Sequence, residues 1–172
     1  MKSLTKEQLL SLLSVAKKDS ERNWLMLALT FNHGLRVSET LSLTPQKCRD
    51  GFLSVSRLKG SLHTTQPLVA SADLLLDEKS AVEGLACLQT IRLFPITRQA
   101  VHKMFRKYCA QVGIPSHLAH IHTLKHTCGM LAIKKAGIEN VRQYLGHKSI
   151  ASTGMYLRVD DQAASQAVQS AL

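Results

Sequence analysis

Three short segments of this chain hold side chains suited to chemistry on a phosphate group. The first is Gly34-Leu35-Arg36-Val37-Ser38-Glu39, in which Arg36 follows a helix-ending glycine and opens a new helix. Backbone N–H groups at a helix start favour phosphate, and a guanidinium binds two phosphate oxygens at once. Glu39 is three residues on and is expected to orient Arg36. The alternative interpretation is a surface arginine with a local ion pair.

The second segment is His122-Thr123-Leu124-Lys125-His126. On a helix, His122, Lys125 and His126 share one face. A two-histidine metal site is the alternative, but the zinc-protease pattern needs Glu directly after the first histidine, and residue 123 is Thr. No carboxylate-rich third ligand is obvious nearby, so we predict no metal. His126 has a second interpretation, as a packed and hydrogen-bonded histidine behind the site.

The third segment is Tyr144-Leu145-Gly146-His147, and Tyr156 is the ninth residue after His147. A single tyrosine is usually structural. Tyr156, however, comes after a Gly-His turn and a short Ser/Thr-rich stretch, residues 149–153, which is an unusual place for a core aromatic. It is therefore a candidate functional residue.

The elements that must position these residues are mostly helices. Strands are expected at 52–56 and 65–69, forming an antiparallel hairpin around a Lys59-Gly60-Ser61 turn with Pro67 on an edge strand. The predicted class is mainly α (α+β), one domain over residues 1–172 with a small sheet at one edge. Helices are predicted from Thr5, over 21–32, 37–43, 98–112 and 122–136, and in shorter pieces at 139–145 and 149–157, with a loosely helical stretch at 72–90.

Composition narrows the class of partner. The chain has 172 residues, 22 Lys plus Arg and 12 Asp plus Glu, and a formal charge of +10, which favours a polyanion. No run of apolar residues is long enough for a membrane helix, and the first residues lack a signal-peptide core. Cys48, Cys87, Cys109 and Cys128 form no CxxC pair and are interpreted as reduced core residues, so the cytoplasm is the expected location.

Taken together and in order, the three segments resemble the catalytic domain of the tyrosine recombinase (phage integrase) family. The resemblance runs from about Leu4 to Val159. It implies a site-specific recombinase or integrase that cuts and rejoins double-stranded DNA through a covalent 3′-phosphotyrosine, without metal or cofactor. By position, Tyr156 matches the nucleophile, Arg36 and Lys125 the cations on the phosphate oxygens, His122 the proton-handling histidine, His147 a phosphate hydrogen-bond donor, and Lys59 the lysine that protonates the leaving oxygen.

Two departures from the family pattern matter. The family has arginine where this chain has Lys125, and losing an optimal transition-state donor costs roughly 100- to 1,000-fold in rate. A catalytically weak DNA-binding regulator on the same fold is therefore the alternative function, and Lys125→Arg is expected to leave cleavage equal or better. The family's N-terminal clamp domain is also missing from the pattern, so DNA binding is expected to be weak and salt-dependent.

The remaining expectations concern DNA contacts and assembly. Lys103, Arg106 and Lys107 on the basic helix 98–112 are candidate DNA-binding residues, with a solvated basic face as the alternative. The resemblance implies a monomer in solution that forms a tetramer on paired DNA sites. The small, mildly apolar tail at 160–172 is a candidate for docking onto a neighbouring protomer, or else a frayed terminus.

Overall fold

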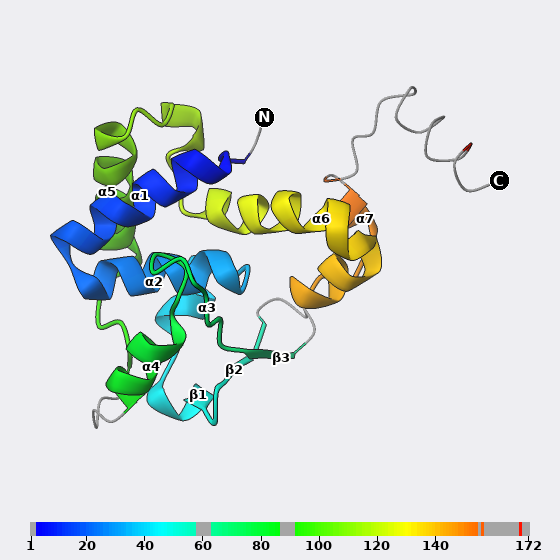
Figure 1. Ribbon diagram of the computed structural model, residues 1–172, viewed down its shortest axis with the longest axis horizontal. Coiled ribbons are helices and arrows are strands. Elements are labelled where there is room, and N and C mark those ends of the chain that lie inside the picture. The colour runs from blue at the N-terminus through cyan, green and yellow to red at the C-terminus, as the bar shows by residue number, and fades with distance from the viewer. Residues whose placement is uncertain (1–2, 58–62, 87–91, 155, 157–168, 170–172) are drawn as a thin grey trace.

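Local capping signals start the helices where the sequence predicts them. In the computed structural model (Figure 1), Thr5 Oγ1 accepts from the Gln8 N–H and Gln8 Oε1 accepts from the Thr5 N–H, a reciprocal cap at the start of α1. The side chains of Ser20 and Thr97 cap α2 and α5 by accepting from the N–H groups of Asn23 and Ala100. The structure describes residues 3–57, 63–86, 92–154, 156 and 169. Its helices of more than one turn are α1 (Lys6–Asp19), α2 (Glu21–Asn32), α3 (Val37–Leu41), α4 (Lys79–Ala86), α5 (Arg98–Gln111), α6 (His122–Tyr144) and α7 (Ala151–Gly154).

The central element is α2, as its nearly uninterrupted apolar sequence predicts. Residues 23–30 are all buried, and the helix packs against both α1 and α6. In Figure 1, α1 and α2 lie side by side in blue, with α5 beside α1, and the yellow α6 extends to the right above the end of α2. This layer of helices holds the main core, so the ends of α2 and α6 are rigid supports for the loops that follow them.

The sheet has one strand more than the sequence analysis expects. The strands β1 (Cys48–Arg49), β2 (Phe52–Val55) and β3 (Thr64–Pro67) pair antiparallel in the order β1-β2-β3, with Leu53 opposite Gln66 and Val55 opposite Thr64. Pro67 does lie on an edge strand of the described sheet. β1 is a correction: Asp50 and Gly51 both have positive φ, which closes a two-residue turn between β1 and β2.

Three predicted helical segments are longer than the helices that the structure describes there. In the stretch 72–90, helix is described only over Lys79–Ala86. A turn precedes it, in which Asp73 Oδ1 accepts from the Leu75 N–H, and residues 87–91 lie outside the described part. The piece predicted at 149–157 is described as helix only over Ala151–Gly154, and the one at 37–43 ends at Leu41. In short polar segments a side-chain turn competes with the helix.

The break predicted between the helical segments 122–136 and 139–145 is confirmed. Gly137 has φ 76° and interrupts α6, so the segment from Ile138 to Tyr144 runs in a new direction. Two short 3-10 turns, Pro45–Lys47 and Ser116–Leu118, lead into β1 and α6. Among the described helices, none is both long and apolar enough to cross a membrane.

Candidate active site

Arg36 lies at the start of α3, where the sequence places it. Its backbone N–H donates to Glu39 Oε2 at 2.7 Å, and its Nη1 donates to Glu39 Oε1 at 2.8 Å. Burial alone would raise the pKa of Glu39, but the Arg36 N–H, Lys125 and Arg57 outweigh it and the pKa is lowered. Glu39 is therefore a buried carboxylate that orients Arg36, whose side chain keeps 30% of its surface exposed.

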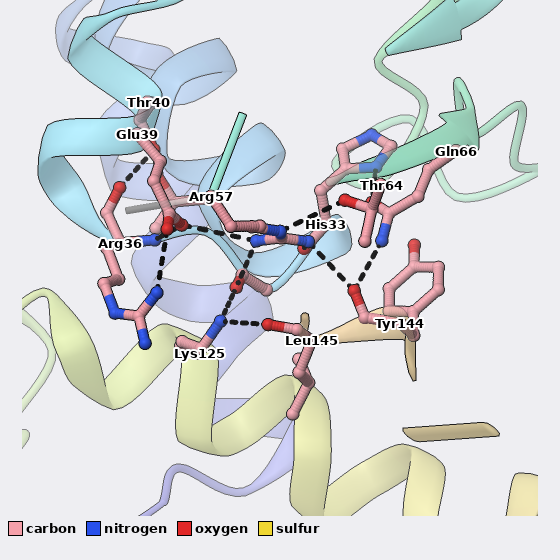
Figure 2. Close-up of polar contacts among 12 residues, drawn as sticks. His33, Arg36, Glu39, Thr40, Arg57, Thr64, Gln66, Lys125, Tyr144 and Leu145 are labelled. Atoms are coloured by element: carbon pink, nitrogen blue, oxygen red, sulfur yellow. Dashed lines mark hydrogen bonds and ion pairs between the residues drawn. The ribbon is translucent and has the colours of Figure 1, made fainter. Parts of the chain in front are cut away.

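Lys125 is deeply buried. It is 1% exposed, and its Nζ donates to the backbone oxygens of Gly34 and Leu145, the second at 2.9 Å (Figure 2). Burial first, and then Arg57, lower the pKa of Lys125 to about 7, while Glu39 opposes the shift. The ammonium thus joins the loop that carries Arg36 to the turn that carries His147.

His147 follows that turn and is brought close to the same cations. Its Nδ1 lies 3.0 Å from Thr153 Oγ1 at the end of α7. Burial, followed by Lys125, Arg36 and Arg57, lowers the pKa of His147 to about 4, so the ring is neutral at pH 7. A neutral imidazole keeps one N–H to donate to a phosphate oxygen.

His122, His126 and Tyr156 form a chain of rings beside the cations. The His122 and His126 ring centroids are 4.6 Å apart, and His126 Nδ1 lies 3.1 Å from the Tyr156 hydroxyl. A β-carbon added at Gly129 would lie 2.6 Å from the Tyr156 ring, so this glycine leaves room for the tyrosine. Burial raises the pKa of Tyr156 to about 12. Desolvation of the His122 ring among its neighbours, followed by His126 and Lys125, lowers the pKa of His122 to about 4, although part of this side chain is exposed.

An open groove of about 890 Å³ lies in front of Arg36 and His122. The beginnings of α3, α5 and α6 meet along it, and its wall carries several more basic or polar side chains. These include Ser38, Arg98, Gln99, His102 and His120. A groove lined this way suits a phosphate backbone, since its cations and helix starts both favour anions.

The other predicted residues lie apart from this groove or outside the described part. Lys103 and Arg106 are exposed on α5. Lys107 forms an ion pair with Asp19 of α1 at 3.2 Å. Their contact with DNA stays a prediction, as does the role of Lys59, which lies outside the described residues. The groove face of α5 instead presents Arg98, Gln99 and His102, which the sequence analysis does not single out.

No metal cluster accompanies the two histidines in the part of the chain that the structure describes. There, no group of three or more His, Cys, Asp or Glu side chains is close enough to hold an ion. The described cysteines, Cys48, Cys109 and Cys128, are buried and free.

Comparison with known proteins connects this geometry to one family. The model of the phage integrase family matches residues 2–163. The chain belongs to the phage integrase family. A tyrosine recombinase of Pseudothermotoga lettingae is 32% identical over 162 residues, which span 89% of this chain and 55% of that protein. The chain thus spans about half the length of this relative.

Solved structures of phage integrase relatives share the fold. XerH site-specific recombinase bound to its difH substrate matches with a TM-score of 0.75 and 22% identity, over 98% of this chain and 54% of that one. A lambda integrase tetramer bound to a Holliday junction matches with a TM-score of 0.69 and 19% identity, over 92% and 50%. These neighbours are complexes with DNA, and the mainly α fold with a small sheet is the fold of this family.

Proposed function

We propose that this chain carries the strand-cutting and rejoining centre of a site-specific DNA recombinase. The observation that supports it is the convergence of Arg36, Lys125, His147 and the His126–Tyr156 pair at one place, beside a basic groove. Positive charge fixed around one phosphodiester stabilises the negative charge that gathers on its oxygens during substitution at phosphorus.

In the proposed step, Tyr156 Oη bonds to phosphorus and the bond from phosphorus to the 5′ oxygen breaks. The phenol proton passes to a neutral imidazole, and the 5′ oxygen takes up a proton from a donor such as Lys59. The product is a 3′-phosphotyrosyl link and a free 5′-hydroxyl, so the bond is conserved for rejoining without metal or nucleotide. Because burial holds the pKa of Tyr156 near 12, the phenol needs this base, and His126 Nδ1 at 3.1 Å supports that role.

Double-stranded DNA is the proposed partner, with a monomer in solution and a tetramer on paired sites. An apolar groove of about 450 Å³ between α2 and α6 supports assembly. It is lined mainly by Phe31, Leu131, Ala132, Val141, Tyr144 and Leu145. We propose that this groove receives the small, mildly apolar tail at 160–172 of a neighbouring protomer.

A covalent-adduct assay tests the proposed chemistry. The protein is incubated in EDTA with a nicked duplex that traps the cut strand, and denaturing electrophoresis then detects DNA joined to protein. We expect an adduct from the wild type and none from Tyr156→Phe, because the phenylalanine has no hydroxyl to attack phosphorus.

Retention of DNA by both proteins without any adduct would instead favour the regulator on the same fold. An adduct formed equally by Tyr156→Phe would show that a different residue is the nucleophile.

A further inference from the structure

A buried arginine outside the predicted site joins the segments that carry it. Arg57 lies two residues past the end of β2, and its guanidinium has no exposed surface. It lies between the end of α2, the start of α3 and the end of α6 (Figure 2). Arg57 is also the last described residue before 58–62, the segment that holds Lys59.

Every N–H group of this guanidinium has an acceptor. An arginine has five such donors. Nε donates to Thr64 Oγ1 at 3.1 Å, and Nη1 donates to Gly34 O at 3.1 Å and to Glu39 Oε2 at 3.3 Å. Nη2 donates to His33 O at 3.1 Å and to Tyr144 O at 2.9 Å. With all its donors engaged and no exposed surface, Arg57 is not a phosphate ligand.

Its acceptors lie close in sequence to the proposed catalytic residues. His33 O and Gly34 O belong to the turn that leads into Arg36, and Tyr144 O belongs to the turn that leads into His147. Lys125 Nζ reinforces the same connection, since it donates to Gly34 O and Leu145 O. Two buried cations therefore tie the Arg36 turn to the His147 turn.

Packing around the arginine leaves little freedom for these turns. A β-carbon added at Gly146 would lie 2.8 Å from Arg57 Cγ, so the His147 turn rests directly on the arginine stem. Gln66 Nε2 donates to the same Tyr144 oxygen at 2.6 Å, which ties β3 into the contact. Burial lowers the pKa of Arg57 while Glu39 opposes that shift, so the carboxylate is the counter-ion that stabilises the buried charge.

We propose that Arg57 is a positioning residue for DNA strand cleavage, which holds the Arg36 turn, the His147 turn and the hairpin in the mutual placement that one phosphodiester needs. This inference rests on the proposed function, because it assigns a role within that reaction. A misplacement of about 1 Å in such a site lowers a rate on the order of 100-fold.

The test compares Arg57→Gln with the wild type in single-turnover adduct formation at saturating DNA. The amplitude reports the fraction of folded, competent protein, and the rate constant reports the geometry of the site in that fraction. We expect Arg57→Gln to lower the rate constant about 10- to 100-fold when the two proteins are compared at the same temperature and per competent molecule. The DNA affinity of the variant is expected to stay within about threefold of the wild type. A purely structural role would lower only the amplitude.

A milder variant and a matched control accompany it. Thr64→Val keeps the shape of residue 64 but removes the acceptor of Arg57 Nε, and we expect a rate constant about 3- to 10-fold lower. Arg49→Gln removes the same charge from an exposed position on β1, and we expect no more than about a twofold change. Because Thr64→Val conserves packing, it decides the question even where Arg57→Gln does not fold.

Hydrogen exchange gives a readout that needs no activity. Amides of 33–38 and 144–148 are expected to exchange faster together in Thr64→Val and Arg57→Gln, while those of α1 stay as protected as in the wild type. If the wild type cleaves DNA and both variants do so with the same rate constant, the positioning role is wrong and the proposed function stands. Absence of any wild-type adduct would overturn the proposed function, and the positioning role with it.

Discussion

Lys125 stands where the family resemblance leads us to expect an arginine, and its surroundings give this difference a testable consequence. An arginine stays charged at any relevant pH, whereas burial and Arg57 lower the pKa of Lys125 to about 7. The folded-state pKa is below the unfolded value, so the ammonium is charged below about pH 7 and loses its proton as the pH rises through that value. The imidazole of His147, with a pKa near 4, stays neutral over the same window.

The rate of cleavage is therefore expected to change with pH as Lys125 loses its proton. With DNA below saturation, we compare the rate constant of adduct formation by Lys125→Arg with that of the wild type. The ratio of the two rate constants should rise with pH above about 7, toward tenfold per pH unit. At pH 6.5 the variant is expected to cleave equally well or better. The measurement is the second-order rate constant of adduct formation from pH 6 to 9 for both proteins.

Titration of Tyr156 affects both proteins alike, so the ratio isolates position 125. Parallel profiles would mean that the charge of Lys125 does not change over this range. Loss of all cleavage in a folded Lys125→Arg protein would mean that the family alignment of α6 is wrong.

At the scale of elements, sequence reasoning located the helices because their signals are local. Caps at Thr5, Ser20 and Thr97 and the break at Gly137 each depend on a few neighbouring residues, and all are found in the structure. The strand β1 was not predicted, because a strand of two residues is too short to show an alternating pattern of apolar and polar residues. The Asp50-Gly51 pair, which favours a tight hairpin turn, was the available signal.

The candidate site was predicted less completely, because the residues that hold its side chains in place come from segments far apart in the sequence. Arg36, His122, Lys125, His147 and Tyr156 follow from family spacing, whereas nothing in the spacing shows that a buried guanidinium joins their loops. A signal did exist: Leu53 and Val55 are the buried residues of β2, and Arg57 continues their alternation two residues past the end of the strand. An arginine at such an inward position needs buried acceptors.

The turn between α2 and α3 yields a stability prediction. Gly34 has φ 55°, and a β-carbon there would lie 2.2 Å from Leu145 Cδ2. We expect Gly34→Ala to lower the free energy of unfolding by about 2–4 kcal/mol, through left-handed strain and overpacking together. Urea denaturation followed by circular dichroism measures it.

Gly84→Ala is the matched control, since nothing lies within 4 Å of a β-carbon at this position in α4. Alanine is the better helix former, so we expect a gain of about 0.5–1 kcal/mol. Equal stability of Gly34→Ala and the wild type would contradict the close approach of the two turns.

At the scale of the whole molecule, the apolar groove between α2 and α6 sets an assembly prediction. Leu131 lines it and is 44% exposed. Light scattering is expected to show a monomer of about 19.0 kDa without DNA and a tetramer on DNA that carries paired sites. Leu131→Glu places a charge in the groove and is expected to abolish the tetramer.

The same variant provides its own control, because Leu131 lies outside the proposed catalytic set. Adduct formation on a single-site duplex should stay within about twofold of the wild type. A stable tetramer without DNA would contradict the predicted monomer in solution. A Leu131→Glu protein that assembles normally would rule out the groove as the acceptor of the tail.

The carbonyl oxygen of Gly34 accepts from both Arg57 and Lys125. One atom with two lone pairs is thus shared between a side chain that follows β2 and a side chain of α6. A change in the length or charge of either side chain therefore alters the hydrogen bond that the other side chain donates to that oxygen. Natural variation at 57 and 125 is accordingly expected to be correlated, because the two side chains share one acceptor.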